Sequence, residues 1–130
     1  MMPVILVADH NEQNRTLVAQ HVDALGYCSL RAPSGFLALD ILNANPQISM
    51  LIVDASLPDI SAMDLTRRLC REAKLEQLSI IIISDKISIK DINQFLELGA
   101  SYFVPKPLNL ERLKELVVKV MSRKTKREGN

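Results

Sequence analysis

Aromatic residues are scarce in this chain: they make up 4% of its 130 residues, and tryptophan is absent. Cysteine is limited to two residues and glycine to four, and the composition as a whole excludes a fibrous or disordered chain. With 16 Lys and Arg against 15 Asp and Glu, no strong field favours direct binding of nucleic acid. No apolar run reaches the roughly 18 residues of a membrane span, and residues 4–8 lack the basic flank of a signal peptide. We therefore expect a cytoplasmic protein with one folded domain.

The two cysteines, Cys28 and Cys70, lie far apart and lack the spacing of metal ligands. Free cysteine is among the residue types that are most often buried. We expect both thiols to be small buried side chains in a reducing compartment.

Hydrophobic residues make up 48% of the chain and follow two alternating patterns. Short apolar runs of strand length alternate with stretches of helical period, and the alternation repeats five times. The four consecutive isoleucines at 80–83 are typical of a strand that is covered on both faces, as in a parallel sheet. The expected strands are residues 4–8, 28–31, 50–53, 79–83 and 102–104.

The helical stretches begin and end at residues with known capping preferences. Serine or asparagine before the first apolar position caps a helix, and glycine after the last one terminates it. The expected caps are Ser34, Ser88 and Asn109, and the expected terminators are Gly26 and Gly99.

The third and fifth helices have less sharply defined ends. The third is predicted over residues 62–73, with Asp59 or Ser61 as its cap. The last apolar position of the fifth is Met121, so residues 123–130 are expected to be a frayed, polar basic tail or the start of a linker. The folded domain is therefore expected over residues 3–122.

Strands that alternate with helices throughout predict an α/β fold with right-handed crossovers and helices on both faces of the sheet. Five such units fit the (βα)5 doubly wound, flavodoxin-like arrangement, a five-stranded parallel sheet in the order 2-1-3-4-5. In sheets of this kind, ligands bind beyond the carboxyl ends of the strands, where the winding direction changes.

Polar residues stand at the carboxyl ends of four predicted strands: Asp9, Asp54, Ser84 and Lys106. Two carboxylates that are brought together repel one another and need a cation, and Mg²⁺ accepts carboxylate and phosphoryl oxygens together. A carboxylate beside a metal ion, a lysine and a hydroxyl is suited to receive a phosphoryl group.

These residues and their spacing resemble the receiver domains of two-component response regulators. The resemblance extends over about Val4 to Met121. It depends on the segments Ile5-Leu6-Val7-Ala8-Asp9, Leu51-Ile52-Val53-Asp54 with Pro58, Ser84, Leu98-Gly99-Ala100-Ser101 and Lys106-Pro107.

The resemblance implies that Asp54 accepts a phosphoryl group from a histidine kinase or a phosphotransfer protein. It implies that Ser84 and Lys106 bind the phosphoryl group, that Ser84 and Phe103 act as the switch, and that the peptide bond before Pro107 is cis. The implied Mg²⁺ ligands are Asp9, Asp54 and the backbone carbonyl of Ser56. Such a domain is a phosphoacceptor and not an enzyme.

The helix that follows Ser88 carries more apolar residues than one buried stripe requires. These residues are Ile87, Ile89, Ile92, Phe95, Leu96 and Leu98. They could form a wide core face. In the family, the fourth helix, fifth strand and fifth helix instead form a surface for a downstream protein or a second copy, and that surface is the alternative. No direct nucleic-acid or membrane partner is expected.

Two residues depart from the family pattern. His10 stands where the family has a second acid that binds Mg²⁺ directly, and imidazole prefers softer metals, so Mg²⁺ binding is expected to be weakened or absent. Asp85 stands where a small residue is usual, and its charge repels a phosphoryl donor unless it turns to solvent. Asn11 or Glu12 could supply a replacement metal ligand.

The sequence is therefore compatible with three functions. The first is a phosphorylatable switch, and the second is an atypical pseudo-receiver that acts as a phosphorylation-independent protein-interaction module. The third is an enzyme of similar topology, such as a flavodoxin or an aspartyl phosphohydrolase. Residues 9–12 provide neither a Gly/Ser/Thr-rich phosphate loop nor an Asp-x-Asp motif, which disfavours the enzymes.

Overall fold

The computed structural model describes residues 2–85 and 88–128 of the chain. Five parallel strands form one sheet in the order β2-β1-β3-β4-β5, as the sequence predicts. The strands are β1 (Val4–Ala8), β2 (Cys28–Ala32), β3 (Ile48–Asp54), β4 (Ser79–Ser84) and β5 (Tyr102–Pro105).

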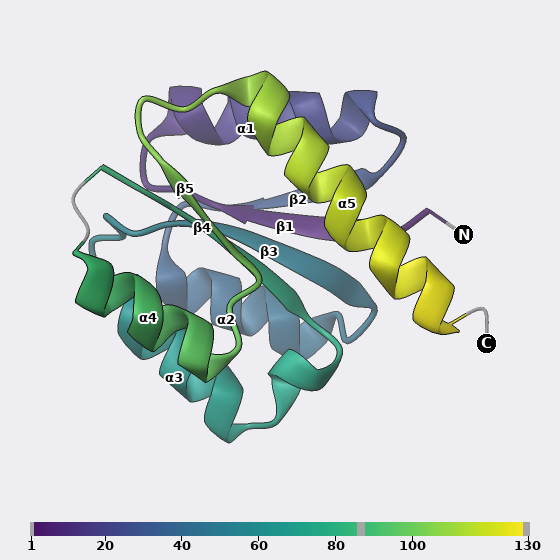
Figure 1. Cartoon of the computed structure of the whole chain (residues 1–130). Helices are drawn as coiled ribbons and strands as arrows, with labels where there is room; N and C mark the ends of the chain where they lie inside the picture. Colours follow the sequence, from purple (N-terminus) through teal and green to yellow (C-terminus); the bar gives the residue numbers. More distant parts are fainter. Residues whose placement is uncertain (1, 86–87, 129–130) are drawn as a thin grey trace.

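Helices cover both faces of this sheet (Figure 1). One face carries α1 (Glu12–Ala24) and α5 (Leu110–Glu128). The other face carries α2 (Gly35–Ala44), α3 (Ala62–Arg71) and α4 (Ile89–Leu98), with a short 3-10 turn, η1 (Lys74–Glu76), before β4. The predicted α/β fold, with helices on both faces, is confirmed.

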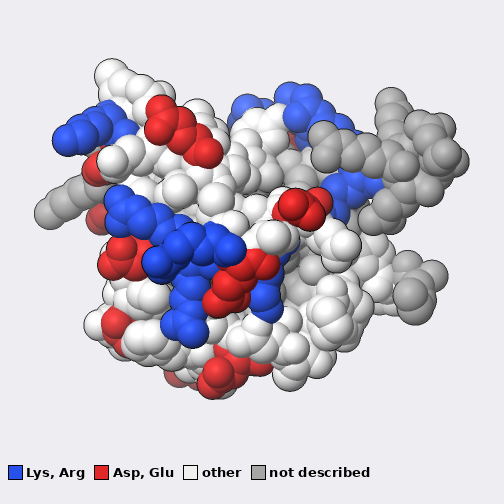
Figure 2. All heavy atoms as spheres, turned by 90° about the horizontal axis from the view of Figure 1, so that it is seen from below, with Lys and Arg blue, Asp and Glu red and all other residues white. Residues whose placement is uncertain are grey.

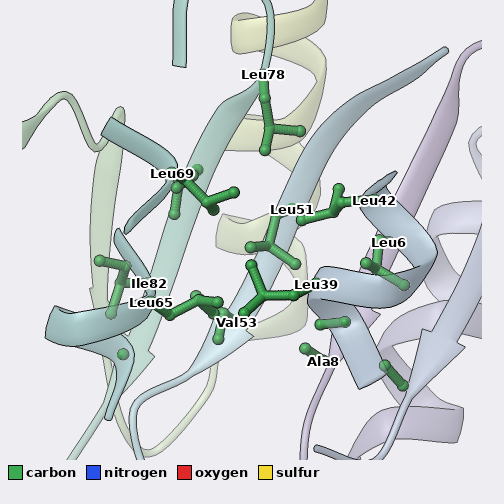
Figure 3. Packing of buried hydrophobic residues seen from close by; sticks show 14 of the residues in the cluster. Leu6, Ala8, Leu39, Leu42, Leu51, Val53, Leu65, Leu69, Leu78 and Ile82 are labelled. Carbon is green, nitrogen blue, oxygen red and sulfur yellow. The ribbon is translucent and has the colours of Figure 1, made fainter. Parts of the chain in front are cut away.

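Successive side chains of a strand enter different cores. In β4, Ile80 and Ile82 belong to the core beneath α2, α3 and α4, whereas Ile81 and Ile83 belong to the core beneath α1 and α5. In Figure 3, Leu51 of β3 lies between Leu42 of α2 and Leu69 of α3. Burial on both faces explains why the inner strands β1, β3 and β4 are mostly apolar with no regular polar alternation, whereas the edge strands β2 and β5 are more exposed.

The predicted helix caps are confirmed by hydrogen bonds. Ser34 Oγ accepts from the backbone N–H of Leu37 (3.2 Å), and Ser88 Oγ from that of Asp91 (3.1 Å). Asn109 Oδ1 accepts from the N–H of Arg112 (3.1 Å). Gly26 (φ 95°) and Gly99 (φ 113°) lie just beyond α1 and α4 in the left-handed region, where a Cβ is unfavourable.

Two helix ends differ from the prediction. Ser61, and not Asp59, caps α3, and the helix ends at Arg71 because Ala73 turns into the left-handed region (φ 58°) before η1. Helix α5 continues to Glu128, so the part of the expected frayed tail that the structure describes is helical. The boundary predicted at residue 122 therefore falls inside a continuous helix.

The prediction that both cysteines are buried is wrong. Cys28 and Cys70 are both exposed. Cys28 is the first residue of β2, at the edge of the sheet, and Cys70 lies on the exposed side of α3. Residue type alone does not decide burial here, because apolar neighbours such as Leu69 occupy the core positions.

Within the described residues, no helix is both long and apolar enough to span a membrane.

Candidate functional site

The polar residues at the strand ends come together at one edge of the sheet. Asp54 is the last residue of β3, and Ser84 is the last residue of β4. The backbone N–H of Lys106, directly after β5, donates to the carbonyl oxygen of Ser84 (2.9 Å). Asp9, Asp54 and Lys106 line a common cavity of about 180 Å³. This cavity is the candidate site.

Asp54 is the most deeply buried acid of the site, with 2% of its surface exposed. Its Oδ2 forms an ion pair with Lys106 Nζ (2.6 Å). Its Oδ1 accepts from the backbone N–H (2.9 Å) and the hydroxyl (2.6 Å) of Ser56. Burial alone raises the pKa of Asp54, but the hydrogen bonds from Lys106 and Ser56 together outweigh burial and hold that pKa below its ordinary value. Asp54 is therefore ionised at neutral pH, as a carboxylate nucleophile must be.

Lys106 is the permanent cation of the site. Burial lowers the pKa of its ammonium group, but the hydrogen bond and charge of Asp54, with the charge of Asp9, raise the pKa above its ordinary value. The lysine thus stays charged beside Asp54. The peptide bond between Lys106 and Pro107 is cis, as the resemblance implies.

Asp9 is also buried, with 6% of its surface exposed, and its Oδ1 accepts from the backbone N–H of Asn11 (2.9 Å). Burial raises the pKa of Asp9, and the negative charge of Asp54 raises it further, despite the opposing effects of the Asn11 N–H and of nearby cations. One of those cations is Arg15, whose Nη1 donates to the backbone carbonyl of Asp9 (2.9 Å). Arg15 was not among the predicted site residues; its position in the first helix, six residues after Asp9, is the sequence signal that places it near the site.

An Asp9→Asn variant is expected to be more stable than the parent protein near neutral pH in metal-free buffer, by about 1 kcal/mol, the scale of like-charge repulsion in a partly solvated site. In the parent protein, the folded-state pKa of Asp9 is raised above 3.8. The protonated Asp9 therefore stabilises the folded state fully below pH 3.8, and this stabilisation is lost as pH rises through the folded-state pKa. Urea unfolding in EDTA measures the difference. Asp40→Asn on the exposed side of α2 is the control, and a less stable Asp9→Asn protein would contradict the expectation.

The proposed replacement metal ligands do not join the site. The side chain of Asn11 caps α1 by accepting from the N–H of Asn14 (2.9 Å), and His10 and Glu12 are exposed. Within the described residues, no three His, Cys, Asp or Glu side chains are grouped for metal binding. Asp9 and Asp54 still provide the one or two carboxylates that Mg²⁺ takes beside water and phosphate oxygens. Their mutual repulsion favours a cation, so this minimal set of donors fits Mg²⁺.

The remaining predicted site residues lie around this centre. Ser84 is buried, whereas Asp85 is exposed, and the charge of Asp85 contributes to the raised pKa of Lys106. Phe103 is half-buried and packs against Phe95 of α4, with ring centroids 6.1 Å apart. Ser84 and Phe95 also line a second cavity, of about 230 Å³. Ser84 and α4 therefore face a common cavity.

The apolar residues of α4 serve both the core and the surface. Phe95 is buried, whereas Ile89 and Leu96 are 78% and 47% exposed. Ile87 lies outside the described residues.

Seen from the side of α2, α3 and α4, basic side chains gather beside acidic ones (Figure 2). Part of this charge is neutralised by the pair Arg67–Asp64 in α3 and by the pair Arg68–Glu72, in which Glu72 directly follows α3.

Comparison with known proteins agrees with this arrangement. The sequence profile of the response regulator receiver domain matches residues 5–118. The two-component response regulator ORR3 of Oryza sativa subsp. indica is 27% identical over 119 residues, which cover 92% of this chain and 91% of that protein. A chemotaxis protein CheY homolog of Campylobacter jejuni is 26% identical over 118 residues, covering 90% of this chain and 91% of that protein.

Solved structures share the whole architecture. A response regulator receiver protein from Pseudomonas putida has a TM-score of 0.85 and 28% identity, covering 92% of this chain and 98% of that one. A CheY-like receiver domain protein from Methanospirillum hungatei has a TM-score of 0.87 at 20% identity, covering 98% and 99% of the two chains. The second comparison supports the fold alone.

Proposed function

Because this chain belongs to the response regulator receiver domain family, we propose that it accepts a phosphoryl group on Asp54 and switches partner binding in response. The phosphoryl donor is a histidine kinase or a phosphotransfer protein in the cytoplasm. The observation that carries the proposal is the environment of Asp54, an ionised and buried carboxylate with Lys106 Nζ 2.6 Å from one of its oxygens.

In the proposed reaction, a carboxylate oxygen of Asp54 attacks the phosphorus atom of the donor. The new oxygen–phosphorus bond forms while the bond between phosphorus and the donor breaks, and the donor leaves with that electron pair. Lys106 and the hydroxyl of Ser84 donate hydrogen bonds to the phosphoryl oxygens. Asp9, Asp54 and the backbone carbonyl of Ser56 would hold Mg²⁺, which when bound neutralises phosphoryl charge.

The switch follows from new charge next to Ser84. The phosphoryl group competes for Lys106 and draws the Ser84 hydroxyl toward it, and Ser84 and Phe95 line the same cavity. Phe103 contacts Phe95, so the change reaches α4. The exposed Ile89 and Leu96 support the proposal that the surface of α4, β5 and α5 binds a downstream protein or a second copy.

The direct test is to incubate the protein with acetyl phosphate and Mg²⁺ and to record its intact mass. We expect the mass of one phosphoryl group to be added, and hydroxylamine, which cleaves acyl phosphates, to remove it. If the folded protein stays unmodified by both acetyl phosphate and a phosphorylated phosphotransfer protein, the pseudo-receiver function is favoured. Circular dichroism of the same sample confirms that the protein is folded.

We further propose that His10 weakens Mg²⁺ binding, because the exposed imidazole replaces a hard oxygen donor beside Asp9. His10→Asp is expected to tighten Mg²⁺ binding by at least about tenfold, since even a change in the outer shell of a metal site typically alters affinity by about tenfold or more. Calorimetric titration with Mg²⁺ measures the affinity. His10→Asn is the matched control because it removes the imidazole without adding a charge. Equal affinities for all three proteins would contradict this proposal.

A further inference from the structure

The loop between β3 and α3 is attached to a distant helix by one carboxylate. Asp59 Oδ1 accepts from the backbone N–H of Gly35 (2.9 Å), and Asp59 Oδ2 accepts from that of Phe36 (2.9 Å). Both donors are in the first turn of α2, where backbone N–H groups have no partner within the helix. Asp59 Oδ1 also accepts from the N–H of Ile60 (3.0 Å), so the carboxylate joins its own loop to α2.

The same contact leaves no room for a side chain on α2. A Cβ atom at Gly35 would lie 2.1 Å from Ile60 Cγ2 and 3.4 Å from Leu57 Cδ1. The first of these distances is far inside van der Waals contact, so the loop and the start of α2 are packed directly against each other. Hydrogen bonds and close packing therefore fix the same two segments.

This attachment holds one end of the segment that carries Ser56. At the other end, the N–H of Ala55 donates to the carbonyl of Ile83 in β4 (2.8 Å). Leu57, in the middle, is buried in the core. Ser56 lies between these anchors and donates both its N–H and its hydroxyl to Asp54 Oδ1.

We infer that Asp59 is a positioning residue of the phosphorylation site, which holds Ser56 against Asp54 from the first turn of α2. Without the Asp59 carboxylate, the loop loses its hydrogen bonds to α2, and Ser56 moves more freely beside the nucleophile. This inference rests on the proposed function in the part of the test that measures phosphoryl uptake, whereas the part that measures hydrogen exchange is independent of it.

The test compares Asp59→Ala with Ser34→Ala. Ser34 also caps the first turn of α2, by accepting from the N–H of Leu37, and among the described residues its side chain makes no hydrogen bond to the loop. Both variants weaken the same helix end. We expect Asp59→Ala to speed amide hydrogen exchange of residues 55–60 by about tenfold, and Ser34→Ala to speed exchange only at the start of α2.

Initial rates of phosphoryl uptake from acetyl phosphate provide the functional readout. Asp59→Ala is expected to lower the rate by about fivefold through poorer orientation of the site, while Ser34→Ala leaves the rate unchanged. Asp59→Asn, which retains one acceptor oxygen, is expected to recover part of that rate, and it replaces the alanine variant if the latter does not fold.

The outcomes separate the two proposals. Unchanged exchange of residues 55–60 in the Asp59 variants, or equal changes in the Ser34 variant, would overturn the inference. Faster exchange with an unchanged uptake rate would make Asp59 merely structural and would also overturn it. If the parent protein takes up no phosphoryl group, the proposed function fails, and the exchange data alone decide whether Asp59 positions the loop.

Discussion

Asp54→Asn is expected to gain no phosphoryl group under conditions in which the parent protein gains one. The amide has nearly the shape of the carboxylate, and its oxygen can still accept from the backbone N–H and hydroxyl of Ser56. The substitution removes the ionised oxygen that pairs with Lys106, and with it the nucleophile of the proposed reaction. The expected effect is a complete loss of the added mass in a protein that remains folded.

A second variant shows that this loss belongs to Asp54 and not to any acid near the loop. Asp64 lies in the first turn of α3, where its exposed side chain pairs with Arg67 (3.0 Å). Asp64→Asn is expected to take up phosphoryl at the parental rate. A phosphoryl group retained by Asp54→Asn would place the acceptor elsewhere, and Asp9 is the other carboxylate that lines the cavity.

The fold was predictable because its determinants are local in sequence. The inner strands β1, β3 and β4 are almost wholly buried and mostly apolar, and Ile80–Ile83 are divided between the two cores as the parallel-sheet interpretation requires. Capping depends on contacts three residues apart, which is why Ser34, Ser88 and Asn109 were found from sequence.

The site was predictable only in part, because some of its contacts join distant segments. Asp59 was a candidate cap for the helix that follows it, yet two of the three N–H groups from which it accepts lie 23 and 24 residues earlier, in α2. The resemblance pointed to the carbonyl of Ser56, whereas the structure also brings its hydroxyl to Asp54. No periodicity or spacing rule reports the contact between Asp59 and α2, since it depends on how the loop packs in three dimensions.

Lys106→Ala is expected to lower the free energy of unfolding by about 3 kcal/mol near pH 7, the lower end for loss of one partner of a buried ion pair. Asp54 is almost fully buried, and without Lys106 the hydrogen bonds that its carboxylate keeps, within the part of the chain that the structure describes, are the two from Ser56. Those two bonds place the effect at the lower end of the range. Urea unfolding in metal-free buffer measures the difference.

The pH dependence identifies the cause of that loss. Because Lys106 helps to hold the folded-state pKa of Asp54 below 3.8, the pair stabilises the parent protein above pH 3.8, and this stability is lost as pH falls through the folded-state pKa. In Lys106→Ala, burial is no longer offset by the ammonium group, so the pKa of Asp54 rises and its carboxyl is protonated sooner on acidification. The stability difference between the two proteins must therefore shrink as pH falls from about 7 to about 4.

The control is Lys114→Ala, which breaks the exposed pair with Glu111 and is expected to lower the free energy of unfolding by less than about 1 kcal/mol. A deficit for Lys106→Ala that stayed constant with pH would instead indicate lost packing of the lysine side chain.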